Sequence, residues 1–384
     1  MISYKEKYRI PFNKSFIAGS EIEFIKEAID SRNLSGDGPF TTRCHDWLRA
    51  EFNGSEVLLT HSATAALEMA AILLDIGVDD EVVIPSYTFV SSVNAFVLRG
   101  ATPVFVDICP ETQNISVTGI ENAITNRTKA ILVVHYAGVA CDMHAIQDLA
   151  KRHDLNIIED SAQGIKARHG GVALGNIGSV GCVSFHETKN VSCGEGGAII
   201  VNDRSLIDRA RIIREKGTNR TKFKNGEVDK YTWCDIGSSY LPNELTAAYL
   251  FAQLQVASEI TRRRLDLWTR YDEFFKPNAQ NWKVKTPKIP EYAKHNGHIY
   301  YLIFDTSERA GGFIEHCASF GIQVVRHYTS LHDSLGAASS GSITKGSLPN
   351  TVTAATQLVR LPLWPDLDSE MDYVLTSFEN FFQS

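Results

Sequence analysis

Short apolar runs alternate with stretches of helical spacing through the first two thirds of the chain. The apolar runs predict buried strands at residues 57–59, 81–87, 103–107, 129–136, 155–159, 180–185 and 198–201. Apolar residues at helical spacing predict helices at 21–31, 41–52, 63–76, 89–99, 117–124 and 143–153. Buried strands separated by helices are typical of a mostly parallel sheet with helices on both faces. The pattern therefore predicts an α/β fold.

The pattern changes near residue 243. Helical spacing extends over 243–275, and a smaller α+β segment follows, with strands at 299–304 and 323–328 and helices at 308–320 and 369–382. The stretch 336–347, which is rich in glycine and serine, predicts a mobile surface loop. A chain of 384 residues exceeds the length at which one hydrophobic core usually stops growing. We therefore predict a large domain at 1–245 and, at 246–384, a long connecting helix with a small α+β domain.

Composition and charge narrow the possible partners. A hydrophobic content of 43% and a charged content of 22% are ordinary for a soluble globular protein. The formal charge of −7 argues against general binding of nucleic acids or anionic membranes. The segment 211–230 differs from this balance, because seven of its residues are basic and three are acidic. It is either a solvated charged loop or a flap that faces an anionic ligand.

Cysteine usage and the absence of long apolar runs indicate the compartment. The seven cysteines are scattered, with no CxxC pair and no Cys/His cluster at zinc spacing, so we expect a reducing compartment and no metal. No apolar run approaches the roughly 18 residues that span a bilayer. The first residues also lack the apolar core of a signal peptide. These observations predict a cytoplasmic protein without a membrane partner.

A lysine on a loop, Lys189, is the first candidate for chemistry. It lies in the sequence GCVSFHETKNVSCGEGG, between two predicted strands. Most lysines are exposed and solvated, which is the simpler explanation. The alternative is an amine that condenses with a carbonyl group, which works best when neighbouring groups lower its pKa. The residues that lie near Lys189 decide between these two explanations.

Other candidates lie at the edge of the sheet where ligands of such folds bind, at the carboxyl ends of the strands. Asp160 ends the apolar run LNIIED, with Gln163 three residues later, and Tyr87 ends the predicted strand 81–87. Ser62 is a natural N-cap of the helix that follows, with Thr64 in its first turn. Hydroxyl and free N–H groups at a helix start can bind phosphate.

Together these groups match what pyridoxal phosphate requires. Its phosphate binds at a helix N-terminus, its ring packs on an aromatic side chain, its aldehyde reacts with a lysine and its pyridine nitrogen pairs with a carboxylate. Each residue alone has a simpler explanation, as a cap, a core aromatic residue or a surface charge. No GxGxxG motif follows the first strand, so a dinucleotide cofactor would lack its phosphate loop. The combination favours a pyridoxal phosphate enzyme.

The chain also resembles a known family over most of its length. The resemblance to the DegT/DnrJ/EryC1/StrS sugar-nucleotide aminotransferases is carried by the segments IPFN, GDGPFT, HSATAALEMA, IPSYTFVSSVNAFVLRGATPVFVD, EDSAQG, SFHETKN and GEGGA. It implies the aspartate aminotransferase fold (PLP fold type I), with a mostly parallel seven-stranded sheet in the large domain and a smaller C-terminal α+β domain. It also implies a homodimer with interfacial active sites and L-glutamate as the amino donor, released as 2-oxoglutarate.

Three further segments indicate the substrate. FHETKN, REKGTNR and DKYTWCDIGSSYL are most similar to family members that aminate a dTDP-4-keto-6-deoxyhexose at C4. The resemblance therefore implies dTDP-4-amino-4,6-dideoxy-D-galactose as the product, used for enterobacterial common antigen or an O-antigen.

The resemblance also assigns roles to individual residues. It implies that Lys189 holds the cofactor as a Schiff base and that Asp160 pairs with the pyridine nitrogen. Tyr87 would stack on the ring, and Gln163 would lie near the ring and its phenolic oxygen. The residues implied in phosphate binding are Ser62, Ala63, Thr64 and Ser184.

One motif departs from the family pattern. Many members have an NYRM motif whose asparagine reaches the phosphate of the partner subunit, and the matching run here begins with Ser239, whose hydroxyl would replace the asparagine. Candidates for the diphosphate of a sugar nucleotide are Arg220, Lys222 and Lys230. Candidates for the sugar are His327, Tyr328 and His332, although core packing is an equal alternative for Tyr328.

Three other functions stay open. A sugar dehydratase of the same fold would have histidine in place of the lysine, so Lys189 argues against it. An aminotransferase could act on another ketosugar, with a 3-keto group or a gluco epimer as the product. A regulatory protein on the same fold is the third, because fold does not determine function.

Overall fold

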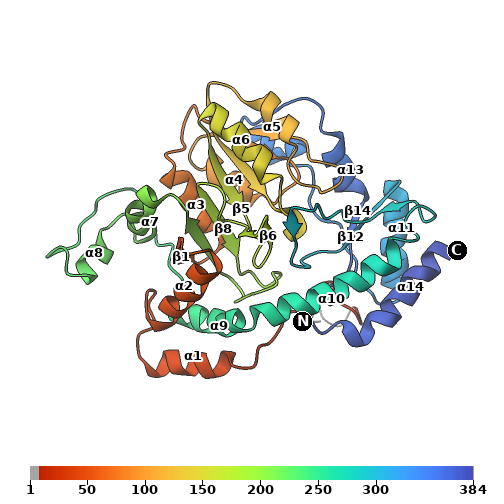
Figure 1. Ribbon diagram of the computed structural model, residues 1–384, viewed down its shortest axis with the longest axis horizontal. Helices are drawn as coiled ribbons and strands as arrows, with labels where there is room; N and C mark the ends of the chain where they lie inside the picture. Colours follow the sequence, from red (N-terminus) through yellow and green to blue (C-terminus); the bar gives the residue numbers. More distant parts are fainter. Residues whose placement is uncertain (1–7, 384) are drawn as a thin grey trace.

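The centre of the molecule is an eight-stranded sheet. The structure is a computed structural model that describes residues 8–383 (Figure 1). In spatial order the strands are β1 (Glu56–Thr60), β9 (Gly197–Val201), β8 (Val180–Ser184), β5 (Asn156–Asp160), β4 (Thr128–Val134), β2 (Glu81–Pro85), β3 (Thr102–Val106) and β13 (Ile343–Thr344). In this sheet β9 runs antiparallel to β1 and β8, and every other pair of neighbouring strands is parallel. The predicted α/β fold with a mostly parallel sheet is confirmed, and the short β13 extends the seven predicted strands.

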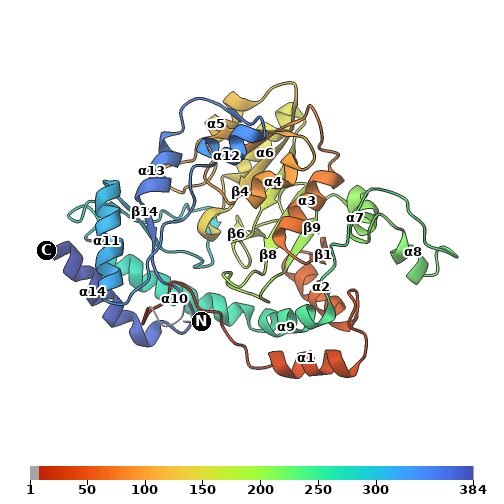
Figure 2. The same cartoon turned by 180° about the vertical axis from the view of Figure 1, so that it is seen from behind.

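Helices cover both faces of this sheet because its strands are apolar on both sides. Alternate residues divide between the faces, so Val82 and Ile84 pack with one helical layer and Val83 packs with the other. The first layer contains α3 (Ala63–Leu73), α4 (Ser91–Val97) and α7 (Ile207–Arg214). The second contains α5 (Val117–Ala123) and α6 (Met143–His153), with α2 (Pro39–Glu51) and α9 (Glu244–Gln255) beside β1 (Figure 2). The helix α1 (Glu21–Asp30) packs on α9.

A second core lies around a small antiparallel sheet. This sheet contains β10 (Val284–Lys285), β12 (Tyr301–Phe304) and β14 (Leu358–Arg360). Its helices are α10 (Ala257–Phe275), α11 (Ser307–Ser319), α13 (Pro349–Gln357) and α14 (Met371–Gln383). The predicted helix at 243–275 is divided into α9 and α10 at Val256. The predicted strand at 323–328 is wrong, because this segment forms only an isolated bridge between Val325 and Arg360.

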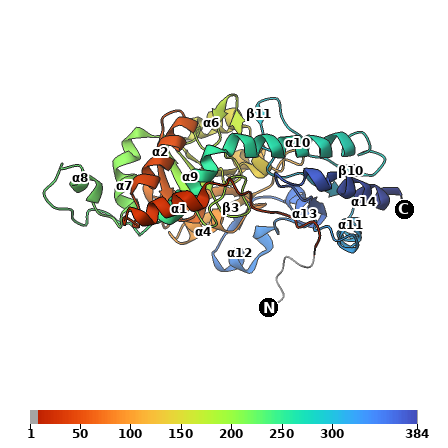
Figure 3. The same ribbon diagram turned by 90° about the horizontal axis from the view of Figure 1, so that it is seen from below.

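Several short elements complete the chain. A three-stranded sheet joins β6 (Arg168–His169), β7 (Val172–Ala173) and β11 (Ala293–Lys294). The helix α8 (Arg220–Lys224) projects from the body of the molecule (Figure 3). Single-turn 3-10 helices occur at Tyr136–Gly138, Arg204–Leu206, Leu331–Asp333 and Asp368–Glu370. In the part of the chain from 8 to 383, no helix combines the length and the apolar character needed to cross a membrane.

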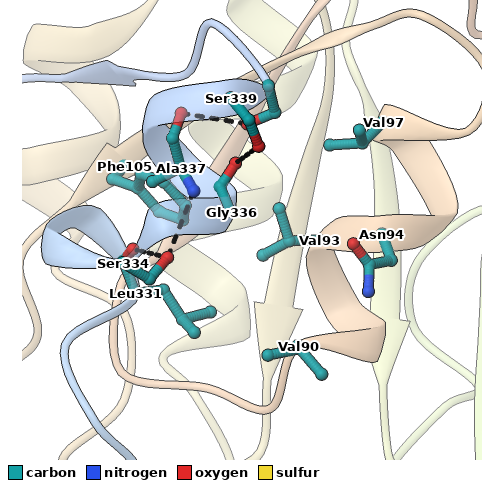
Figure 4. Close-up of a pocket in the computed structure, with 11 residues that line it drawn as sticks. Val90, Val93, Asn94, Val97, Phe105, Leu331, Ser334, Gly336, Ala337 and Ser339 are labelled. Atoms are coloured by element: carbon teal, nitrogen blue, oxygen red, sulfur yellow. Dashed lines mark hydrogen bonds between the residues drawn. The ribbon is translucent and has the colours of Figure 1, made fainter.

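The stretch 336–347 is not the loop that its composition predicts. It contains most of α12 (Leu335–Ser339) and the strand β13, which pairs with β3. The hydroxyl oxygen of Ser334 accepts a hydrogen bond from the N–H of Ala337 at 3.1 Å and so caps α12. Ala337 is buried against α4, and a small groove of about 190 Å³ remains between the two helices (Figure 4). Part of the C-terminal chain, α12 and β13, therefore packs on the large sheet. The domain boundary after residue 245 stays a prediction.

Candidate active site

The loop that follows β8 holds Lys189 at the wall of a cavity of about 580 Å³. The loop is compact because its backbone folds back on itself. The N–H of Phe185 donates to the carbonyl of Gly196 at 2.8 Å, and the N–H of Lys189 donates to that of His186 at 2.9 Å. The cavity is also lined by eight other predicted site residues, Ser62, Ala63, Thr64, Asp160, Gln163, Ser184, His327 and Tyr328. The structure thus brings most of the predicted site together.

The amine of Lys189 is easier to deprotonate than that of an exposed lysine. Its surroundings lower its pKa from 10.5 to about 8. The main cause is loss of hydration in the cavity, and the positive charge of Arg360 acts in the same direction. The carboxylate of Asp160 opposes the shift. An amine that is partly neutral near neutral pH can act as a nucleophile and as a base.

Asp160 is a buried carboxylate at the end of β5. One oxygen accepts a hydrogen bond from the hydroxyl of Ser92 at 2.7 Å, and the other accepts one from the N–H of Ala162 at 3.0 Å. The hydroxyl of Thr88 lies 2.9 Å from that of Ser92 and extends the network. Among the described residues, no cation forms an ion pair with Asp160. A buried carboxylate of this kind favours a ligand that is positively charged or donates a proton.

The N-terminus of α3 forms another wall of the cavity. The hydroxyl oxygen of Ser62 caps the helix by accepting a hydrogen bond from the N–H of Ala65 at 3.0 Å. Ala63 and Thr64 line the cavity, and first-turn N–H groups have no partner within a helix. Gly197 on β9 lies close behind, since a Cβ there would be only 2.4 Å from the nitrogen of Ala63. The arrangement is suited to a phosphate group.

Gln163, His327 and Tyr328 form the wall toward the small sheet. The side-chain N–H of Gln163 donates to the hydroxyl of Tyr328 at 2.9 Å. The rings of His327 and Tyr328 are stacked, with centroids 3.6 Å apart. Burial lowers the pKa of His327 well below its usual value, so its ring is neutral at neutral pH.

Tyr87 does not lie where its prediction requires. Only 1% of it is exposed, and its ring packs against those of Tyr136 and Tyr328, each 5.4 Å away. The cavity is instead lined by Phe89, two residues later. The predicted strand was too long, because β2 ends at Pro85 and the chain has already left the sheet at Tyr87. Stacking by Tyr87 is therefore corrected to an aromatic contact available from Phe89.

His332 also lies outside the cavity walls. Its Nδ1 atom is 2.7 Å from the hydroxyl of Ser86, and its Nε2 atom is 3.3 Å from the carboxylate of Asp333. These contacts hold the chain before α12 against the end of β2. The prediction that His332 approaches the sugar does not fit this placement.

The cavity lining does not include the predicted residues Arg220, Lys222, Lys230 and Ser239. Arg220 and Ser239 line a separate pocket of about 210 Å³, together with Lys216. Lys222 forms an ion pair with Asp208 at 3.1 Å. Lys230, also outside the Lys189 cavity, is exposed on the loop after α8. The helix α8, which carries Arg220 and Lys222, projects from the body of the molecule (Figures 1 and 3).

Of the lining residues that were not predicted from the sequence, four bear directly on the groups of the site. They are Thr88, Phe89, Ser92 and Arg360. The first three follow β2 closely, so a shorter strand would have drawn attention to them. Arg360 carries a clearer signal, because it is a single charge within the apolar run LVRLPLW.

Comparisons with known proteins show which proteins the chain resembles. The model of the DegT/DnrJ/EryC1/StrS aminotransferase family matches residues 16–379. GDP-perosamine synthase of Escherichia coli O157:H7 is 32% identical over 295 residues, 77% of each chain. The spore coat polysaccharide biosynthesis protein SpsC of Bacillus subtilis strain 168 is 29% identical over 379 residues, which are 97% of this chain and 96% of SpsC. The aminotransferase TlmJ of Streptoalloteichus hindustanus superposes with a TM-score of 0.88 at 27% identity, over 97% of this chain and 99% of TlmJ.

Proposed function

Since the chain belongs to the DegT/DnrJ/EryC1/StrS aminotransferase family, we propose that it transfers the amino group of L-glutamate to the C4 ketone of a dTDP-4-keto-6-deoxyhexose. The products would be dTDP-4-amino-4,6-dideoxy-D-galactose and 2-oxoglutarate. The amino sugar would enter a cell-surface polysaccharide such as enterobacterial common antigen or an O-antigen. The names of GDP-perosamine synthase and SpsC support a sugar substrate and a polysaccharide pathway. The first name also makes a GDP-linked ketosugar the second candidate.

Aminotransferases of this family use pyridoxal 5′-phosphate, and the cavity fits this cofactor. Lys189 would bind its aldehyde, Asp160 its pyridine nitrogen and the N-terminus of α3 its phosphate, with Ser184 beside the phosphate and Phe89 against the ring. When bound, the cofactor accepts the amino group from the donor and passes it to the ketosugar. The observation that carries the proposal is that the Lys189 amine and the unpaired Asp160 carboxylate line one cavity.

The residues of the chain then have separate tasks. The Lys189 amine, free once the donor is bound, takes the proton from the donor Cα and later returns a proton to C4 of the sugar. Asp160 keeps a proton on the pyridine nitrogen, so the ring can withdraw electrons from the reacting carbon. Gln163 would lie beside the phenolic oxygen of the cofactor. His327 and Tyr328 would contact the sugar.

We further propose a cytoplasmic homodimer with its active sites at the interface. The pocket of Arg220 and Ser239 would then face the site of the partner subunit, where Ser239 contacts the phosphate. Arg220, Lys222 and Lys230 would approach the diphosphate of the sugar nucleotide. Their separation from the Lys189 cavity within one subunit supports such a division of the site between two copies.

The test is to incubate the purified protein with L-glutamate and a panel of nucleotide ketosugars. The panel holds dTDP-linked 4-keto and 3-keto sugars and a GDP-linked 4-keto sugar, and the product is identified by mass and by its configuration at C4. We expect amination of the dTDP-4-keto sugar to the galacto product. A GDP-linked or 3-amino product would replace the proposed substrate, and a protein that binds no pyridoxal phosphate would refute the function.

Variants of Lys189 and Asp160 test the two central groups. Lys189→Ala should lose the visible absorption of covalently bound cofactor, and Asp160→Asn should keep the cofactor. Both should lose activity by about 100-fold or more. The exposed residues Lys151 and Asp148 on α6 provide the controls Lys151→Ala and Asp148→Asn, which should leave absorption and activity unchanged. Normal turnover in either test variant would exclude the proposed role.

A further inference from the structure

Arg360, at the end of β14, lines the same cavity as Lys189 and also an adjoining larger cavity of about 1030 Å³. One terminal nitrogen of its guanidinium donates to the carbonyl of Arg326 at 3.0 Å. The Nε atom is buried and has no hydrogen-bond partner within the described chain. The guanidinium carbon lies 4.5 Å from the ring centroid of Phe12, so one flat face of the group is covered.

This buried guanidinium lacks the anionic partner that a buried cation usually has. No carboxylate of residues 8–383 pairs with it, and burial lowers its pKa from the usual value of arginine. A buried cation without an anion is unfavourable, because desolvation is not compensated by an ion pair. A ligand carboxylate would supply the missing charge, and the planar group of arginine matches carboxylate geometry.

Arg264 shows why Arg360 is the better candidate. It lines the larger cavity and also has no acidic partner among the described residues. Its Nε–H, however, donates to the carbonyl of Gly297 at 3.1 Å, and a terminal N–H donates to that of His298 at 2.7 Å. Two donors of Arg264, its Nε–H among them, thus have backbone partners, whereas the buried Nε–H of Arg360 has none in the described chain.

We propose that Arg360 binds the α-carboxylate of the amino donor, an inference that rests on the proposed aminotransferase function. In glutamate this carboxylate is bonded directly to the carbon whose proton Lys189 would remove. A cation that shares the cavity wall with Lys189 is therefore in reach of it. The diphosphate of a sugar nucleotide is separated from the reacting C4 by the sugar ring, so it would lie farther from Lys189.

Binding measurements on the holoenzyme test the site without turnover. The probe is maleate, an unreactive dicarboxylate, titrated by calorimetry into wild type, Arg360→Lys and Arg360→Gln. Loss of a charge-assisted hydrogen bond should raise its dissociation constant about 10- to 100-fold in both variants. The control is Arg263→Lys, because Arg263 pairs with Glu259 and Asp366 and lines neither cavity. Its maleate affinity should stay within about twofold of wild type.

Single-turnover reactions identify which substrate Arg360 serves. Bleaching of the enzyme by L-glutamate should require about 10- to 100-fold more donor in Arg360→Lys. The affinity for 4-aminobutyrate, which has no α-carboxylate, and the reaction of the aminated enzyme with the nucleotide sugar should change by about twofold or less. Equal losses for glutamate and 4-aminobutyrate, or a loss confined to the sugar reaction, would overturn the inference.

The two proposals fail in different ways. If glutamate does not bleach the wild type, the proposed function is wrong, whereas unchanged maleate and glutamate affinities in Arg360→Lys refute only the role of Arg360. Arg360→Lys keeps a cation at the site, so it tests the inference even if Arg360→Gln does not fold.

Discussion

Loss of water around the Lys189 amine determines when this residue becomes reactive. With a pKa of about 8, about half of the amines are neutral at pH 8, whereas an exposed lysine with a pKa of 10.5 is almost entirely protonated there. Only the neutral amine attacks an aldehyde. Because the pKa is lowered, the reactive fraction increases as the pH rises through about 8 and then levels off.

The first prediction concerns capture of the cofactor by the cofactor-free protein. The rate of capture of pyridoxal phosphate should rise with pH and reach a plateau above about pH 8. The visible absorption of the bound cofactor gives the rate, and mass spectrometry after borohydride reduction identifies Lys189 as the modified residue. A rate that still rises steeply at pH 10 would show that the amine behaves as an ordinary exposed lysine.

Ser92 provides a second prediction at the scale of single residues. Its hydroxyl donates to Asp160, and a hydrogen bond to a charged group is worth about 1.5–3 kcal/mol. Ser92→Ala should therefore leave Asp160 less firmly oriented and lower kcat about tenfold, with a smaller change in KM for glutamate. The control is Ser319→Ala, at an exposed position on α11. A normal kcat in Ser92→Ala would mean that the N–H of Ala162 suffices to position the carboxylate.

Residues of the site could be predicted where they lie at or soon after the end of a strand. Asp160 ends β5 and Lys189 lies on the loop after β8, and the carboxyl ends of parallel strands meet at one edge of the sheet. Tyr87 was misplaced because β2 ends two residues earlier, and this shift turns its ring into the core. Arg360 could not be placed from sequence, since it comes from a different sheet and reaches the cavity only through tertiary packing.

At the scale of elements, the strands with a strong apolar pattern could be predicted from the sequence, and those without one could not. The seven long strands of the large sheet are apolar on both faces, and all seven were predicted. The strand β13 has only two residues and is held by pairing with β3, which no local pattern reveals. The segment 323–328 contains the β-branched residues Val324 and Val325, which are common in strands. The place beside β12 is nevertheless taken by β14, with Val359 paired to Leu302.

The start of α2 depends on a residue of another helix. Gly38 is the N-cap and has no side chain, so Glu244 of α9 accepts hydrogen bonds from the N–H groups of Gly38, Phe40 and Thr41 at 3.1, 2.7 and 3.1 Å. The hydroxyl of Thr41 donates to the same carboxylate. One buried carboxylate thus replaces the usual capping side chain and joins α2 to α9.

The third prediction is that Glu244→Gln destabilises the protein. An amide has one acceptor oxygen and no charge, so some of these donors lose their partner, and the free energy of unfolding should fall by about 1–3 kcal/mol. Urea unfolding followed by circular dichroism measures this change. The control is Glu23→Gln at an exposed position of α1, which should alter stability by less than about 0.5 kcal/mol. Equal effects in both variants would show that the cap contributes nothing specific.

At the scale of the whole molecule, the segment around α8 is the feature that one subunit does not explain. It projects from the body (Figure 3) and exposes large apolar side chains, among them Trp233, of which 81% is exposed, and Tyr231, of which 52% is exposed. Its basic pocket of Lys216 and Arg220 does not reach the Lys189 cavity of its own subunit. Exposed apolar surface of this kind often marks a protein interface. The family resemblance implied a dimer, but the sequence could not show which residues would act across it.

A mixed form of the proposed homodimer tests whether this pocket acts on the partner subunit. The first variant is Lys189→Ala, and the second reverses the charge of the pocket through Lys216→Glu and Arg220→Glu. Each homodimer should be inactive or nearly so, because every site contains one defect.

If the pocket acts across the interface, a mixed dimer has both defects in one site, and its other site is intact. Denaturing and refolding equal amounts together should then restore about a quarter of the wild-type activity, since half of the dimers are mixed and each has one good site. If the pocket instead serves its own subunit, each site of the mixed dimer keeps one defect and mixing restores nothing.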